Sequence, residues 1–246
     1  RQIFMKNLKL FAAAVMLAAC TSASAQFSNA KGSSSSVDTE GWNTVWVQYN
    51  PGSWMPDKGD NMSFNSVSLG YSKAFSVSKS LPLFVEAGAG LQYTWSDEGS
   101  DEDMDVNTHL LSLKIPVDLM YKFDIPNSSV SIMPYLGVNL RYNAWGEEKF
   151  DFNDSDDDDY RYLPTRSSDD YEDLEPWGDS DKLNLFDKDD MGKDYVWKRF
   201  QIGWHIGAKA KFGKSFMLGV GYGTDFNEIC KKTKVGEWTV QLGYTF

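Results

Sequence analysis

From residue 42 to the last residue, the sequence alternates apolar and polar positions with a period of two, in one segment after another. Such alternation is typical of β-strands whose two faces meet different surroundings. In the first segment Trp46 and Val47 are adjacent apolar residues that must point to opposite faces. The pattern therefore does not indicate which of them lies on the apolar face of this segment. Eight segments of this kind predict eight strands, over residues 42–49, 66–75, 85–95, 111–123, 130–142, 199–212, 216–226 and 237–246.

Side-chain size indicates which face of these strands points inward. The polar face is rich in Gly, Ser, Ala and Thr, whereas the apolar face carries Trp, Tyr, Phe, Leu and Ile in nearly every segment. The interior of an eight-stranded barrel is only wide enough for side chains to fill, and overpacking strains a core. We therefore expect the small polar residues inside and the bulky apolar residues outside. The prediction is an all-β fold, an eight-stranded antiparallel up-and-down transmembrane β-barrel.

The lengths of the predicted connections support a membrane barrel. They alternate between long (50–64, 96–107, 145–196 and 227–234) and short (77–82, 124–128 and 213–215). Outer-membrane barrels have short periplasmic turns and longer external loops. At the turn Gly213-Lys214-Ser215, the alternation puts Phe212 and Phe216 on the same face, so these two residues can pair. Three residues then remain for the turn, a common hairpin length. The sequence thus predicts periplasmic termini and external long loops.

The start of the sequence has the pattern of an export signal. Lys6 and Lys9 precede the apolar run 10–19, and Ala23-Ser24-Ala25 matches a signal-peptidase site. We expect a signal peptide over 1–25 with Met5 as the initiator, a flexible periplasmic tail over 26–41, and an outer-membrane barrel over 42–246. A lipidated Cys20 within Leu17-Ala18-Ala19-Cys20 is the alternative. Both alternatives predict export, and the barrel predicts integral insertion in the outer membrane.

The C-terminus resembles the sorting signal of outer-membrane barrels, which end in Phe and are recognised by the barrel-assembly machinery. Here the matching residues are Trp238, Val240, Leu242, Tyr244 and Phe246. The segments 113–117 (LKIPV) and 134–137 (PYLG) resemble the PorT-like outer-membrane β-barrel family, whose architecture is related to that of the small OmpA and OmpX barrels. The resemblance implies outer-membrane lipids and the assembly machinery as partners. It implies no particular activity.

Charged residues recur on the face predicted to point inward. Both signs occur, as is expected where buried charges must be paired or hydrated. We interpret them as a polar network that holds the strands in register, with a narrow conducting path as the alternative. The predicted members are Glu86, Lys114, Asp118, Lys122, Arg141, Arg199, His205, Lys209, Lys211, Asp225 and Glu237.

The loop predicted over 146–195 is strongly acidic. Residues 147–194 contain 19 acidic and six basic side chains, a net charge of −13, against −11 for the whole chain. Blocks of like charge repel and remain solvated, but clustered carboxylates can also bind Ca²⁺. The candidate ligands are Asp151, Asp154, Asp156, Asp157, Asp158 and Asp159, although neither Asp151 nor Asp187 begins a regular EF-hand loop. Aromatic residues among these acids could pack on the barrel rim or bind an extracellular ligand.

Composition and motifs favour a protein without catalytic activity. The negative charge argues against a nucleic-acid partner, because phosphate binding depends on Lys and Arg. No nucleotide or dinucleotide motif and no paired CxxC occurs, so no cofactor other than Ca²⁺ is expected. His109 and Ser112 fall on opposite faces of their segment. We expect a structural or surface-interaction protein of the cell envelope; the alternatives are a small pore or transport or secretion accessory protein, and then an acyl-modifying or proteolytic enzyme.

Overall fold

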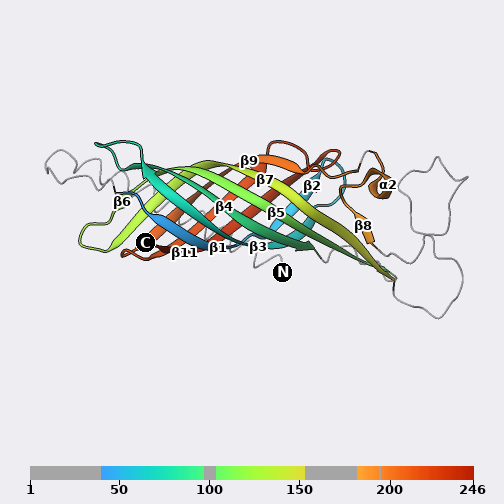
Figure 1. Cartoon of the computed structure of the whole chain (residues 1–246), viewed down its shortest axis with the longest axis horizontal. Coiled ribbons are helices and arrows are strands. Elements are labelled where there is room, and N and C mark those ends of the chain that lie inside the picture. The colour runs from blue at the N-terminus through green and yellow to red at the C-terminus, as the bar shows by residue number, and fades with distance from the viewer. Residues whose placement is uncertain (1–39, 97–103, 153–181, 194) are drawn as a thin grey trace, which may run out of the picture.

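The computed structural model describes residues 40–96, 104–152, 182–193 and 195–246, and consists of one antiparallel β-barrel (Figure 1). The predicted signal peptide and most of the predicted tail lie outside the described residues. Within the described part of the chain, no helix is both long and apolar enough to cross a membrane. The ring is formed by β1 (Asn43–Tyr49), β3 (Met62–Ser76), β4 (Leu83–Ser96), β5 (Met104–Tyr121), β7 (Val130–Phe152), β9 (Phe200–Phe212), β10 (Phe216–Asp225) and β11 (Thr233–Thr245).

The barrel closes because β1 pairs with both β3 and β11. The short strand β2 (Gly52–Pro56) also pairs with β3 and β11, so it continues the path of β1 after an interruption at Asn50 and Pro51. The eight-stranded barrel predicted from the sequence is confirmed. The long connection predicted over 50–64 is wrong, since strand pairing in this place continues to Pro56.

The connections at the two ends of the barrel differ in length. We call the end predicted to face the periplasm the periplasmic end, and the opposite end the external end. At the periplasmic end, Phe212 pairs with Phe216 across the predicted turn, and Gly213 has a φ of 61°, which glycine adopts without a steric penalty. At the other end, β5 and β7 pair as far as Met104 and Phe152, beyond the limits of the predicted loops. There β7 also pairs with β8 (Lys182–Asn184), which precedes the short helix α2 (Lys188–Met191). In Figure 1 these elements lie at the end opposite β6 (Phe123–Asp124) and the C-terminus.

The apolar face of the strands forms the outer wall of the barrel. Leu69, Leu91 and Leu136 are each more than half exposed, as are Phe216 and Leu242. In the first strand Val47 is 53% exposed whereas Trp46 is 2% exposed, which settles the facing that the sequence left open. The expected placement of most bulky residues on the outside is therefore confirmed.

Several bulky side chains nevertheless lie inside the barrel, which the size argument did not anticipate. Trp46 fits because it packs on Gly70 and Gly90; a Cβ atom on either glycine would lie within 2.5 Å of the indole ring. Tyr135 packs in the same way against Gly207 and Gly221. Glycines on neighbouring strands thus provide the volume that the inward rings occupy. The alternation of the strand had placed Tyr135 on the inward face, whereas it left the facing of Trp46 open.

Candidate functional site

The centre of the lumen holds a cluster of charged side chains around Lys209. Its ammonium group lies 2.8 Å from Asp118 Oδ2 and 3.1 Å from Glu86 Oε2, and all three side chains are at least 95% buried. His205 Nε2 lies 2.6 Å from Asp118 Oδ1, and Ser72 donates a 2.6 Å hydrogen bond to Glu86. The buried ammonium group is thus flanked by two carboxylates. β3, β4, β5 and β9 supply these five residues.

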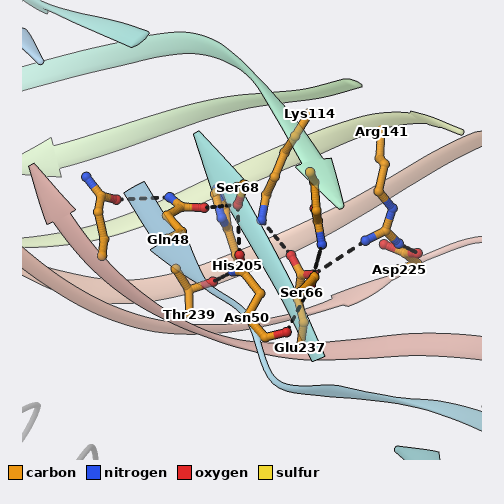
Figure 2. A network of polar contacts seen from close by, with 12 residues as sticks. Gln48, Asn50, Ser66, Ser68, Lys114, Arg141, His205, Asp225, Glu237 and Thr239 are labelled. Carbon is orange, nitrogen blue, oxygen red and sulfur yellow. Dashed lines mark hydrogen bonds and ion pairs between the residues drawn. The ribbon is translucent and has the colours of Figure 1, made fainter. Parts of the chain in front are cut away.

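A second charged cluster surrounds Glu237, nearer the external end. Lys114 Nζ lies 2.7 Å from Glu237 Oε1, and Arg141 lies 3.5 Å from the same carboxylate and 2.5 Å from that of Asp225 (Figure 2). Gln92 donates a 3.1 Å hydrogen bond to Glu237 Oε2. These residues come from β4, β5, β7, β10 and β11, so one carboxylate on β11 connects strands on opposite sides of the ring.

Uncharged polar side chains extend the network to the remaining strand of the ring, β1. Gln48 donates to Gln241 at 3.0 Å, and Asn50, which follows β1, donates to Thr239 at 2.8 Å. Ser68 donates to Asn50 Oδ1 at 2.9 Å (Figure 2). All eight strands of the ring therefore contribute a polar side chain to the interior.

Three of the residues predicted for this network lie apart from the two clusters. Arg199 is exposed at the external rim, where it donates to the carbonyls of Asn143 and Ala144, because β9 begins only at Phe200. Its assignment to the interior is therefore wrong. Lys122 pairs with Asp124, whose side chain is 60% exposed, near the periplasmic turn. Lys211 lies over the ring of Trp42. The other predicted members lie in the clusters, whereas Gln92, Ser72 and Tyr135 were not among the residues predicted for the network.

Apolar clusters close the lumen on both sides of the charged network. The periplasmic cluster is formed by Trp42, Ala74, Phe84, Met120, Met133, Tyr135 and Met217. The external cluster is formed by Trp54, Phe64, Ile229 and Val235, with Trp197 and Cys230 packed against it. Two cavities between the polar side chains each measure about 10 Å³, room for about one water molecule. Among the described residues, side chains therefore fill the lumen at the levels of the charged network and of the two apolar clusters.

The segment that precedes β9 packs over the external mouth of the barrel. Leu185 is fully buried and accepts a backbone hydrogen bond from Trp197, while Trp197 packs edge-on against Trp54. Lys198 donates its backbone N–H to the carbonyl of Ile229. One alternative from the sequence was that part of the acidic loop folds onto the barrel rim. The described part of the loop is folded in this way.

The remaining predicted sites are placed only in part. Of the calcium candidates, Asp154 and Asp156–Asp159 lie outside the described residues, and only the backbone of Asp151 is described; this site stays a prediction. No cluster of metal-ligating side chains occurs among the described residues. The C-terminal residues that resemble a sorting signal lie on the outer wall, with Val240, Leu242, Tyr244 and Phe246 each at least 41% exposed.

Comparison with known proteins agrees with this architecture. Residues 11–246 match the family model described as outer membrane protein beta-barrel domain. The chain belongs to this family. It is an integral protein of the outer membrane. The narrower PorT-like resemblance is not part of this match, and no curated protein sequence matches the chain.

Solved structures of similar shape include barrels with different roles. The attachment invasion locus protein Ail of Yersinia pestis is 14% identical, with a TM-score of 0.46, over 84% of this chain and 99% of Ail. Neisserial surface protein A is 14% identical, with a TM-score of 0.42, over 83% of this chain and 97% of that protein. The outer membrane enzyme PagL is 13% identical, with a TM-score of 0.40, over 80% of this chain and 97% of PagL.

Proposed function

We propose that this outer-membrane protein is a closed, non-enzymatic barrel that supports a surface for interactions outside the cell. The filled lumen is the observation that carries the proposal. A conducting path would need a continuous water column, whereas the charged side chains within each cluster pair with one another and apolar clusters cover both ends.

The absence of catalytic pairs among the described residues supports a role other than catalysis. His109 lies 2.9 Å from the hydroxyl of Tyr93 on the outer wall, whereas Ser112 is buried and donates to Asn143. His205 is paired with Asp118 in the lumen, where no nucleophilic Ser or Cys of the described chain has a hydrogen bond to it. Replacing both histidines with Gln should leave any hydrolase activity of a purified preparation unchanged.

Planar-bilayer recording tests whether the lumen is closed. We expect the full-length folded protein to give no stable openings, because ions cannot displace the buried ion pairs and apolar clusters without unfolding the barrel. A known porin in the same bilayer shows that insertion is detectable, and resistance to SDS without heating shows that the sample is folded. Stable single-channel openings from the folded protein would contradict the proposal.

The acidic external loop supports the surface-interaction part of the proposal. With a net charge of −13 over residues 147–194, this loop favours cationic partners through attraction that salt weakens. We expect cells that display the protein to adhere to a cationic surface, and adhesion to fall when Asp156–Asp159 are changed to Asn. The matched control is Lys79→Gln in the periplasmic turn, which changes one charge away from the surface. Equal adhesion of all three strains would argue against the loop as the interaction surface.

A further inference from the structure

His205 meets Asp118 across a glycine in the middle of the barrel. Strand pairing places Asp118 of β5 beside Gly137 of β7, and Gly137 beside His205 of β9. Because Gly137 has no side chain, the carboxylate and the imidazole approach each other over it, and His205 Nε2 lies 2.6 Å from Asp118 Oδ1. A Cβ atom at position 137 would overlap both of these atoms. The three residues of this row thus hold the imidazole against one oxygen of a buried carboxylate.

This contact requires a proton on His205 Nε2, because an ionised carboxylate only accepts hydrogen bonds. The other oxygen of Asp118 lies 2.8 Å from Lys209 Nζ, and the same ammonium group lies 3.1 Å from Glu86. The Tyr135 ring packs edge-on against the imidazole at 5.5 Å and adds no charge. With two carboxylates and one ammonium group, the central cluster has a net charge of −1 if the imidazole is neutral, and no net charge if both imidazole nitrogens carry protons.

The same imbalance holds when the cluster around Glu237 is included. The charged groups of the two clusters are the carboxylates of Glu86, Asp118, Asp225 and Glu237 and the cations of Lys114, Arg141 and Lys209. The inward lysines at the periplasmic end lie apart from them, with Lys122 beside Asp124 and Lys211 over the ring of Trp42. An uncompensated charge in a buried site is costly. A fourth cation is therefore favoured, and protonated His205 supplies it.

Water can reach the imidazole, so a proton can be exchanged there. The two cavities of the lumen share His205 and Thr239 as lining residues. One cavity extends to Asp225, and the other extends to Asp118 and Lys209. The His205 side chain is 16% exposed, against 5% for Asp118. Because each cavity has room for about one water molecule, this part of the lumen admits water and protons but no larger ligand.

We propose that His205 is a proton-binding site in the lumen and that its imidazolium form is the fourth cation of the charged network. Unfolding solvates Asp118 and Glu86, and an ordinary histidine in water is mostly uncharged above about pH 6.5. Unfolding in neutral solution therefore releases a proton, so the stability of the barrel falls as the pH rises. The bound proton thus couples the barrel to the pH of its surroundings. This inference goes beyond the closed lumen and does not depend on the absence of conductance.

NMR of the imidazole nitrogens tests the protonation state directly. The chain contains two histidines, so His109→Gln leaves His205 as the only imidazole. His109 lies on the outer wall, where it contacts Tyr93, apart from the charged network. The full-length variant is labelled with 15N-histidine and folded in micelles at about pH 7.5, above the ordinary range of histidine. We expect the two similar 15N shifts of an imidazolium; the two widely separated shifts of a neutral ring would overturn the proposal.

Urea unfolding in micelles tests the coupling to pH. Release of one proton changes the unfolding equilibrium constant by at most about tenfold per pH unit. We therefore expect this constant to rise about 3- to 10-fold from about pH 7 to about pH 8 in the wild-type protein and in His109→Gln, the matched control. In His205→Gln most of this rise should be lost, since other groups that titrate in this range, such as Cys230, are common to all three proteins. A constant that does not rise in the wild-type protein, or one that rises equally in His205→Gln, would contradict a proton bound at His205.

Discussion

At the residue scale, the barrel interior depends on close contacts between rings and glycines and on charges with defined partners. Trp46 and Tyr135 occupy space that would be filled by side chains if the facing glycines were larger residues. Lys209 and Glu237 each contact two oppositely charged groups. Both kinds of contact are specific to single positions, so single substitutions should reveal them.

Gly221→Ala should destabilise the barrel, because a Cβ atom at this position would lie 2.2 Å from the hydroxyl oxygen of Tyr135. We expect a loss of about 1–3 kcal/mol in the free energy of unfolding, the usual cost of overpacking, measured by urea unfolding in micelles. Tyr135→Phe in the same chain should restore part of the loss. Gly219→Ala, on the same strand, meets its neighbours only at 3.3 Å or more and should be close to neutral.

Glu237→Gln should destabilise the barrel more strongly, because it leaves Lys114 and Arg141 buried with less negative charge nearby. Breaking a buried ion pair by removing one partner costs about 3–5 kcal/mol, which the same urea titration measures. Lys122→Met is the matched control, since its partner Asp124 is 60% exposed and such pairs contribute at most about 1 kcal/mol. Similar losses in the two variants would argue against a stabilising role for the central clusters.

At the element scale, period-two alternation was sufficient to predict the eight strands and most of their facing, because each strand lies between two unlike environments. It was insufficient at the external end. There β5, β7 and β2 continue past the apolar band, so neither face meets lipid and the alternation loses its contrast. For the same reason Arg199 was assigned to the interior, although it lies at the rim where β9 has not yet begun. Which residues pair within the network depends on distances across the whole ring of strands. The spacing of residues along one strand does not give these distances.

Depth in the membrane should determine the effect of a charge on the outer wall. Leu113 faces outward in the middle of β5 and is 37% exposed, so Leu113→Arg should destabilise the folded barrel by about 2–4 kcal/mol, the cost of a cation near the bilayer midplane. Phe226→Arg, at the external end beyond β10, should cost at most about 1 kcal/mol. Folding yields in lipid vesicles, read from heat-modifiable migration on gels, compare the two. A larger loss for Phe226→Arg would contradict the assigned membrane level.

At the scale of the whole molecule, the described part of the chain is a cylinder with a side-chain-filled charged network and two unlike ends. The periplasmic end has short turns and an apolar cluster beneath the charged network. The external end has longer strands, a segment that packs over the mouth, and an acidic loop. This arrangement suits the proposed role of a barrel that presents an interaction surface outside the cell.

The position of Glu237 on the last strand has a consequence for biogenesis. Its partners Lys114 and Arg141 lie on β5 and β7, which are synthesised and exported earlier. An open sheet that entered the bilayer before β11 arrived would turn Lys114 toward hydrocarbon without its carboxylate partner, and would leave Arg141 with only Asp225 of its two carboxylate partners, at a high energetic cost. Insertion and curling of the sheet must therefore proceed together, and a chain truncated before β11 should be left outside the membrane for proteolysis.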